Sequence, residues 1–165
     1  KAAWQNLIKL LRAGRKSLPH AETWATPILA LVGLAIAAYL SYVEIAHVEA
    51  ICGPIGGCNV VQSSPYAHIL GIPVAVLGVI YYLGIGVLWA GQRSPSRRWA
   101  NRSVVALLGL TLVGTLFSIY LTILEIFVVQ AICTWCLGSA VAATVLMLLV
   151  VIPVTSSPSP KRGRR

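Results

Sequence analysis

The chain has 165 residues, of which 58% are hydrophobic and 10% are charged, and its mean hydropathy is +0.83. A soluble domain of this size cannot bury so many apolar side chains, so the composition excludes a soluble globular protein. The net charge of +9 comes from basic residues that flank apolar stretches without forming a folded basic domain, which argues against nucleic-acid binding. We therefore expect an integral membrane protein in contact with the lipid bilayer, with no nucleic-acid partner.

Four apolar stretches are long enough to cross a bilayer, which takes roughly 20 residues of helix. In chain order they run about Thr26–Ala46, Ile69–Ala90, Ser103–Phe127 and Ile132–Ile152. In the hydrocarbon core, backbone N–H and C=O groups must hydrogen-bond to one another, and continuous spans of this length favour helices over barrel strands. We predict an all-α integral membrane protein, a four-transmembrane-helix bundle with an outer loop that carries a cysteine pair.

Two polar segments flank the predicted core of residues 25–152. In residues 1–24, Trp4, Leu7 and Leu11 follow a helical spacing with basic residues on other faces, which indicates a helix lying in the cytoplasmic membrane interface. Residues 153–165 contain TSSPSP and basic residues, a composition typical of a flexible tail or linker.

The distribution of basic residues predicts the orientation of the spans. All thirteen lie before the first span, between the second and third, or after the fourth, and the loop of residues 47–68 and the turn of residues 128–131 have none. By the positive-inside rule, both termini and the middle loop are cytoplasmic. The two segments without basic residues then lie on the extracytoplasmic side.

The four cysteines all fall on that extracytoplasmic side, where disulfides form and persist. Cys52 and Cys58 enclose a turn rich in glycine and proline, and Cys133 and Cys136 are one helical turn apart at the head of the last span. Four cysteines allow three pairings. Two nearby disulfides that exchange with each other are the simplest arrangement.

The position of Cys133 at the start of the last helix matters most for the mechanism. Unpaired N–H groups and the helix dipole at a helix N-terminus lower a thiol pKa, and thiol–disulfide exchange needs the thiolate. Cys136, a turn deeper, lies nearer the hydrocarbon, where a lipid-soluble oxidant can reach it. We therefore favour a catalytic dithiol.

Two other interpretations of the cysteines remain open. A zinc site could use two close-spaced thiolate pairs, although an oxidising compartment converts such thiolates to disulfides; we predict no metal. A non-enzymatic membrane scaffold could use two inert disulfides, although a Cys-x2-Cys loop removes little chain entropy. Two carboxylates near the outer ends of the first and third spans, Glu44 and Glu125, are functional candidates, with simple solvation as the alternative.

The order and spacing of several motifs resemble the vitamin K epoxide reductase family, above all its bacterial members, over about residues 25–152. The motifs are Cys52-x5-Cys58, the run CNVVQSS that ends at Ser64, Gly71-Ile72-Pro73 with Gly78, and Cys133-Thr134-Trp135-Cys136. A second family of bacterial membrane enzymes performs similar chemistry on an unrelated four-helix bundle, but it has its cysteine pairs in the reverse order.

The resemblance implies a membrane thiol:quinone oxidoreductase that supports disulfide bond formation, in the bacterial inner membrane. A thioredoxin-like protein or domain reduces the disulfide at Cys52, Cys58 exchanges with Cys133, and Cys136 passes the electron pair to a quinone such as menaquinone, ubiquinone or a phylloquinone-like molecule. Many bacterial relatives carry the thioredoxin-like domain in a longer chain, so the partner here is either separate or part of a longer polypeptide.

The resemblance also implies a quinone site at Cys136, Ser64, Val74 and Ala140. Ser64 matches a serine that the family carries after the second loop cysteine. Animal members place an Asn and a Tyr that hydrogen-bond vitamin K at the positions of Val74 and Ala140, and neither side chain here can do so. We therefore expect a mostly apolar quinone pocket, and epoxide reduction does not follow from the resemblance.

Overall fold

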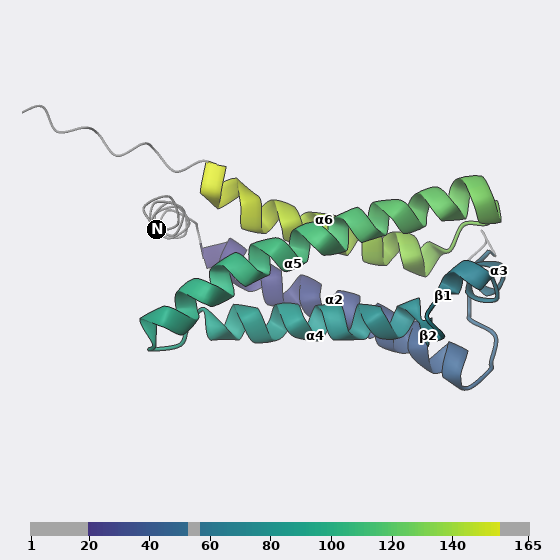
Figure 1. The fold of residues 1–165 in the computed structure, drawn as a ribbon, viewed down its shortest axis with the longest axis horizontal. Coiled ribbons are helices and arrows are strands. Elements are labelled where there is room, and N and C mark those ends of the chain that lie inside the picture. The colour runs from purple at the N-terminus through teal and green to yellow at the C-terminus, as the bar shows by residue number, and fades with distance from the viewer. Residues whose placement is uncertain (1–19, 53–56, 156–165) are drawn as a thin grey trace, which may run out of the picture.

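The computed structural model describes residues 20–52 and 57–155. Four long helices run side by side along one axis (Figure 1). They are α2 (His20–Ile45), α4 (Val74–Gly91), α5 (Arg97–Leu124) and α6 (Thr134–Thr155). Contacts join α2 to α4, α4 to α5, α5 to α6 and α6 back to α2, so the helices close into a bundle.

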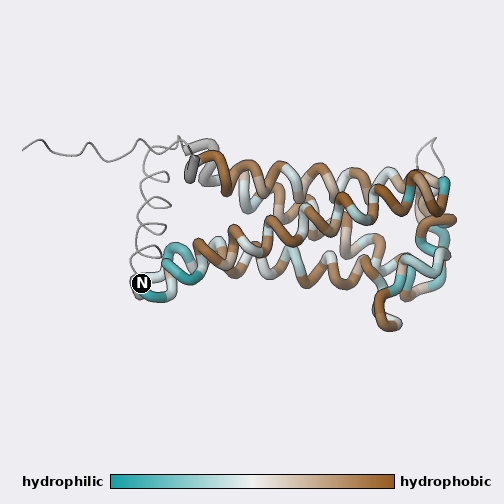
Figure 2. Tube along the Cα trace, turned by 45° about the horizontal axis from the view of Figure 1, so that its top comes forward, coloured by the Kyte–Doolittle hydropathy of each residue, from teal (hydrophilic) through white to brown (hydrophobic). Residues whose placement is uncertain are grey.

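Each long helix carries a segment long and apolar enough to cross a membrane, and the third segment continues past the end of α5. The four segments are Trp24–Ile45, Val74–Gly91, Arg98–Val129 and Thr134–Ile152. Apolar residues follow all four helices over most of their length, and polar residues gather at the two ends of the bundle (Figure 2). A helix that is apolar on every face is the kind that lipid surrounds. The predicted all-α, four-helix integral membrane protein is confirmed.

The bundle is held together by close helix packing. One buried cluster joins the helices at mid-length, and Ile85 and Leu146 in it are fully buried. Gly33 on α2 lets the Tyr82 ring of α4 lie against its backbone, because a Cβ at that position would overlap the ring. Such small residues allow helices to approach closely in lipid, where van der Waals packing replaces the hydrophobic effect.

Short elements cover the end of the bundle that carries the cysteines. After α2 come the helix α3 (Cys58–Gln62), the 3₁₀ turn η1 (Pro65–Ala67), and two strands, β1 (His68–Ile69) and β2 (Ile72–Pro73). The strands pair antiparallel, with Ile69 opposite Ile72. The residues between them, Leu70 and Gly71, both have positive φ angles of 54° and 81°, as a type I′ hairpin turn requires.

The hairpin corrects the predicted start of the second span. That span was expected from Ile69, but α4 begins at Val74, because Pro73 lacks an N–H donor and holds the residue before it in an extended conformation. The third helix begins at Arg97, before the predicted Ser103, since arginines end an apolar stretch without ending a helix.

The first helix also begins earlier than predicted, at His20 and not at Thr26, and the last begins at Thr134 and not at Ile132. Most of the predicted interfacial helix of residues 1–24 lies outside the described residues, as do residues 156–165 of the predicted tail. The predicted glycine-rich turn between the loop cysteines also falls largely outside them, at residues 53–56.

Candidate functional site

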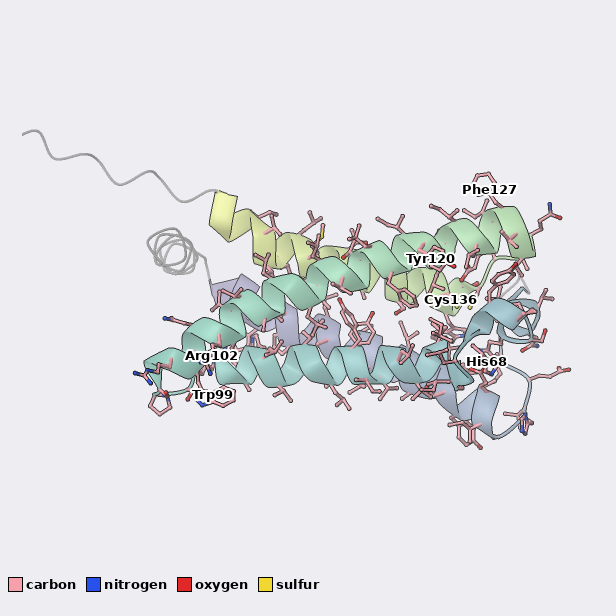
Figure 3. The ribbon with its side chains drawn as sticks, viewed as in Figure 1. His68, Trp99, Arg102, Tyr120, Phe127 and Cys136 are labelled. Carbon is pink, nitrogen blue, oxygen red and sulfur yellow. A yellow bond between two sulfur atoms is a disulfide. The ribbon has the colours of Figure 1, made fainter. Side chains whose placement is uncertain are left out.

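All four cysteines lie together at one end of the bundle. Cys58 and Cys133 are fully buried in one cluster, and Cys52 and Cys136 pack against it. Figure 3 shows Cys136 and His68 at this end of the bundle, whereas Arg102 lies at the opposite end. The structure therefore brings the loop pair and the helix pair into one sulfur cluster, with the described arginines at the far end of the helices.

The loop pair is oxidised and the helix pair is reduced. Cys52 and Cys58 form a disulfide, and Cys133 and Cys136 are free thiols. Gly57, the residue before α3, is packed against the backbone of Ile132, the residue before Cys133. Because of this close backbone contact, the disulfide-bonded loop packs directly against the start of α6.

Three hydrogen bonds fix the chain just before Cys52. The N–H of Ala50 donates to the side-chain oxygen of Asn59 at 2.8 Å. The N–H of Ile51 donates to the Tyr39 hydroxyl at 2.8 Å, and the indole N–H of Trp135 donates to the Ile51 carbonyl at 2.9 Å. The bonds come from α3, α2 and α6, so three elements hold one loop segment, which makes the placement of Cys52 relative to α6 well defined.

Cys133 caps the N-terminus of α6 with its sulfur. Its carbonyl accepts the N–H of Leu137 at 3.0 Å, and its Sγ accepts the N–H of Cys136 at 3.2 Å, the pattern of an N-cap side chain. The hydrogen bond from the Cys136 thiol, and the backbone N–H groups of Cys136 and Trp135, lower the pKa of Cys133 despite its burial. Cys133 is thus prepared to react as a thiolate.

Glu125 reaches the same two cysteines from α5. The helix ends in a π-helical turn, η2 (Glu125–Val129), and Gln130 follows in the left-handed conformation. The Glu125 side chain is 5% exposed, and its Oε2 accepts the N–H of Cys133 at 3.2 Å. The carboxyl also lies within hydrogen-bond reach of the Cys136 thiol. The sequence left open whether Glu125 is simply solvated at the membrane surface. In the structure its side chain is buried and is not solvated.

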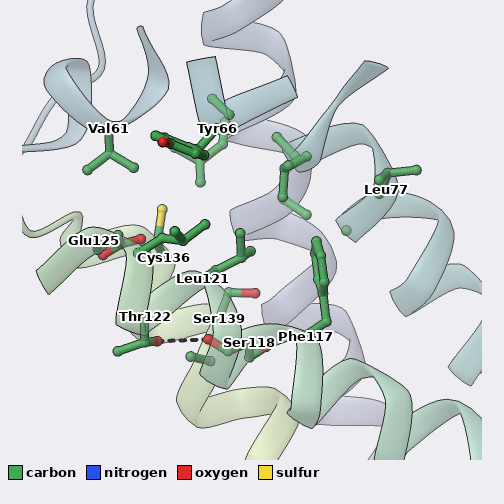
Figure 4. Close-up of a pocket in the computed structure, with 18 of the residues that line it drawn as sticks. Val61, Tyr66, Leu77, Phe117, Ser118, Leu121, Thr122, Glu125, Cys136 and Ser139 are labelled. Atoms are coloured by element: carbon green, nitrogen blue, oxygen red, sulfur yellow. Dashed lines mark hydrogen bonds between the residues drawn. The ribbon is translucent and has the colours of Figure 1, made fainter. Parts of the chain in front are cut away.

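A cavity of about 360 Å³ opens beside Cys136, a volume in the range of small-molecule pockets. Ser64, Val74 and Ala140 line the same cavity as Cys136, so the four predicted quinone-site residues are brought together. Figure 4 shows the Cys136 sulfur and the Glu125 carboxyl side by side at its edge. The Ser64 hydroxyl donates to the Val61 carbonyl at 2.7 Å.

Three buried side-chain polar atoms in the described part of the chain lack a hydrogen-bond partner: Gln62 Nε2, Tyr81 Oη and Glu44 Oε1. All three residues line the cavity. Glu44 Oε1 lies 3.1 Å from His68 Nε2, whereas the amide and the hydroxyl have no such neighbour. Buried polar groups are nearly always paired, so two hydrogen-bond donors are available to a molecule in the cavity. Nothing in the sequence pattern singled out Gln62 or Tyr81 for this role.

Comparison with known proteins identifies the family. Residues 24–151 match the vitamin K epoxide reductase family. The chain belongs to this family. The match covers all four cysteines and, apart from the last residue of the fourth, the four membrane-spanning segments.

A plant relative is much longer than this chain. The thiol-disulfide oxidoreductase LTO1 of Arabidopsis thaliana is 33% identical over 125 residues, which cover 69% of this chain and 32% of that protein. The chain therefore spans about a third of the length of this relative.

Within the vitamin K epoxide reductase family, this chain departs from the animal pattern at the cavity. Val74 and Ala140 present apolar side chains where the resemblance implies hydrogen-bonding Asn and Tyr. The unpartnered Tyr81 hydroxyl and Gln62 amide line the same space. The walls and the donors therefore suit a largely apolar molecule that carries hydrogen-bond acceptors.

Proposed function

We propose that this protein is a membrane thiol:quinone oxidoreductase that supports disulfide bond formation outside the cytoplasm. One observation carries the proposal. A disulfide-bonded loop pair and a free dithiol share one buried cluster, and Cys136 of that dithiol borders an apolar cavity. Inert structural disulfides need neither the free pair nor the cavity.

The relay moves two electrons from the loop to the helix. A thioredoxin-like partner with a dithiol reduces the Cys52–Cys58 disulfide and is itself oxidised. The Cys58 thiolate attacks Cys133 of a Cys133–Cys136 disulfide and frees Cys136. Cys52 then attacks Cys58, which re-forms the loop disulfide and leaves Cys133 and Cys136 reduced. The arrangement in the structure, with an oxidised loop and a reduced helix pair, corresponds to this last state.

Oxidation of the helix pair completes the cycle. The Cys133–Cys136 bond forms, and two electrons and two protons leave the thiols in total. A quinone supplies an acceptor for this electron pair, and the donors available to hold its oxygens are Gln62 and Tyr81. The lowered pKa of Cys133 raises the fraction of reactive thiolate.

We propose that the cysteine end of the bundle lies outside the cytoplasm, in a bacterial inner membrane. The basic residues of the sequence lie before, between and after the spans on the opposite side, which supports this orientation through the positive-inside rule. A cysteine-specific reagent that cannot cross membranes, applied to intact cells after mild reduction, should label Cys52. Labelling that requires access from the cytoplasm would contradict this orientation.

Quinone-dependent oxidation of dithiothreitol by the purified protein tests the function. We expect wild-type protein to oxidise dithiothreitol when a short-chain ubiquinone is added, and Cys136→Ser to abolish the reaction. Cys52→Ser should block reduction by a thioredoxin-like protein, while dithiothreitol, which is small enough to reach the inner pair, still supports turnover. If wild-type protein did not reduce quinone, or if all four cysteines kept one redox state whatever the quinone pool, the scaffold interpretation would be preferred. If Cys136→Ser reduced quinone like the wild type, the role assigned to Cys136 would be refuted.

A further inference from the structure

The Glu125 carboxyl is buried beside a reactive sulfur pair, and no cation of the described residues balances it. Among the described residues no basic side chain forms an ion pair with Glu125. Ionising an unbalanced buried carboxyl is costly, so a carboxyl kept at this place calls for a reason. Capping α6 is one reason, because Oε2 accepts the N–H of Cys133, but a neutral amide oxygen would cap the helix equally well.

A second reason follows from what else the carboxyl touches. The Glu125 carboxyl lies within hydrogen-bond reach of the Cys136 thiol, and both Glu125 and Cys136 line the cavity (Figure 4). The carboxyl thus contacts the reacting sulfur and borders the space in which an electron acceptor would lie. This is the position of a general acid–base group, which must be within hydrogen-bond reach of the proton that it moves.

We propose that Glu125 is a catalytic residue that transfers the proton of the Cys136 thiol to the reduced electron acceptor; this assignment rests on the proposed quinone-reducing function. In the step, the S–H bond of Cys136 breaks, and the Cys133–Cys136 bond forms from the Cys133 thiolate, whose proton has already passed to water. The electron pair goes to a quinone. Glu125 takes the Cys136 proton and releases one to a quinone oxygen, and water at the cysteine end supplies the second proton of the hydroquinone.

Few other groups around the cavity could perform this transfer. Cys133 and Cys136 of α6 are the reacting pair, and Cys58 of α3, next to η2, is held in a disulfide. Glu44 on α2 lies against His68. The hydroxyl groups of Tyr66, Tyr81 and Tyr82 also border the cavity, but a phenol is a poor proton acceptor near neutral pH. Glu125 is the carboxyl in contact with Cys136.

The test is a single-turnover reaction between prereduced protein and ubiquinone-1, followed by quinone absorbance from pH 5 to 9. Glu125→Gln retains an oxygen that can accept the N–H of Cys133 but cannot transfer a proton. We expect it to slow quinone reduction about 100-fold or more, the usual effect of a lost general acid–base group. Glu125→Asp should restore part of the rate. Glu49→Gln makes the same chemical change at an exposed position and should react like the wild type.

A second measurement needs no quinone. The charge of Glu125 opposes a thiolate at Cys133. When the rate of Cys133 alkylation by iodoacetamide is measured against pH, the midpoint of the curve should therefore lie at a lower pH in Glu125→Gln than in wild-type protein. Glu49→Gln should cause no such shift. The shift would also show that the variant protein has an intact dithiol site.

The outcomes separate this assignment from the proposed function. If wild-type protein does not reduce ubiquinone-1, the proposed function fails, and the assignment fails with it. If wild-type protein reduces it and Glu125→Gln does so at the same rate, only the assignment is overturned. A slow Glu125→Gln with an unshifted alkylation midpoint would show a purely structural role and would also overturn the assignment. Slow reduction together with the shifted midpoint supports it.

Discussion

Substitution of Gly57 by alanine should uncouple the two cysteine pairs. A Cβ at Gly57 would lie 2.6 Å from the carbonyl oxygen of Ile132 and 2.8 Å from its nitrogen. These distances are up to about 0.8 Å short of ordinary van der Waals contact at 3.4 Å. Both atoms belong to the backbone that enters α6, so no side-chain rotation relieves the overlap. The loop with Cys58 must therefore move away from Cys133.

The size of the effect follows from that displacement. Overpacking of this kind costs about 1–3 kcal/mol, and a shift of about 1 Å between reacting groups can cost on the order of 100-fold in rate. We expect Gly57→Ala to slow disulfide exchange between Cys58 and Cys133 by about 10- to 100-fold.

The rate is measured in a background that leaves one sulfur in each pair, Cys52→Ser with Cys136→Ser. Diamide is added, samples are quenched with acid at intervals, and the Cys58–Cys133 link is followed by electrophoretic mobility. Gly86→Ala is the matched control, because a Cβ on this glycine of α4 meets no atom within 4 Å. If Gly57→Ala formed the link as fast as the control, the backbone contact would not position the two pairs, and the reasoning would be refuted.

Three further predictions concern the site. Cys136→Ala removes the thiol hydrogen bond that contributes most to the lowered pKa of Cys133, so the pH midpoint of Cys133 alkylation should rise; an unchanged midpoint would show that the backbone N–H groups suffice. Tyr81→Phe removes one of the two unpartnered donors in the cavity and should raise the KM for ubiquinone-1 about 2- to 12-fold, the equivalent of about 0.5–1.5 kcal/mol for one hydrogen bond. The control is Tyr120→Phe, at a tyrosine that is 53% exposed. Equal KM values in the two variants would exclude a hydrogen bond from Tyr81 to the quinone. Trp135→Phe removes the hydrogen bond to the Ile51 carbonyl and should reduce the stability of the loop segment by about 1 kcal/mol, so that dithiothreitol reduces the Cys52–Cys58 disulfide faster. An unchanged rate would show that the hydrogen bonds from Tyr39 and Asn59 are enough to hold the loop.

Much of the architecture could be predicted from local patterns. The four spans follow from hydropathy, because a lipid-facing helix must be apolar on all sides over a fixed length. Helix boundaries were less accurate. The start of α4 was misplaced because Ile69, Leu70 and Ile72 are apolar enough to extend the stretch, although they belong to a hairpin. Hydropathy measures what a residue prefers to contact and says little about the φ angle that its backbone adopts.

Composition and cysteine spacing were sufficient to predict a membrane bundle with its sulfurs at one end, since both depend on properties that residues keep in any fold: transfer free energy, helix length and the one-turn separation of Cys133 and Cys136. The pairing of Gly57 with Ile132, the burial of Glu125 beside the dithiol and the unpartnered Tyr81 hydroxyl became apparent only when the helices were packed. Gly57 and Ile132 are far apart in the chain, and Glu125 meets the dithiol across the short turn that joins α5 to α6. These contacts form because the elements pack at particular rotations. No local pattern encodes those rotations.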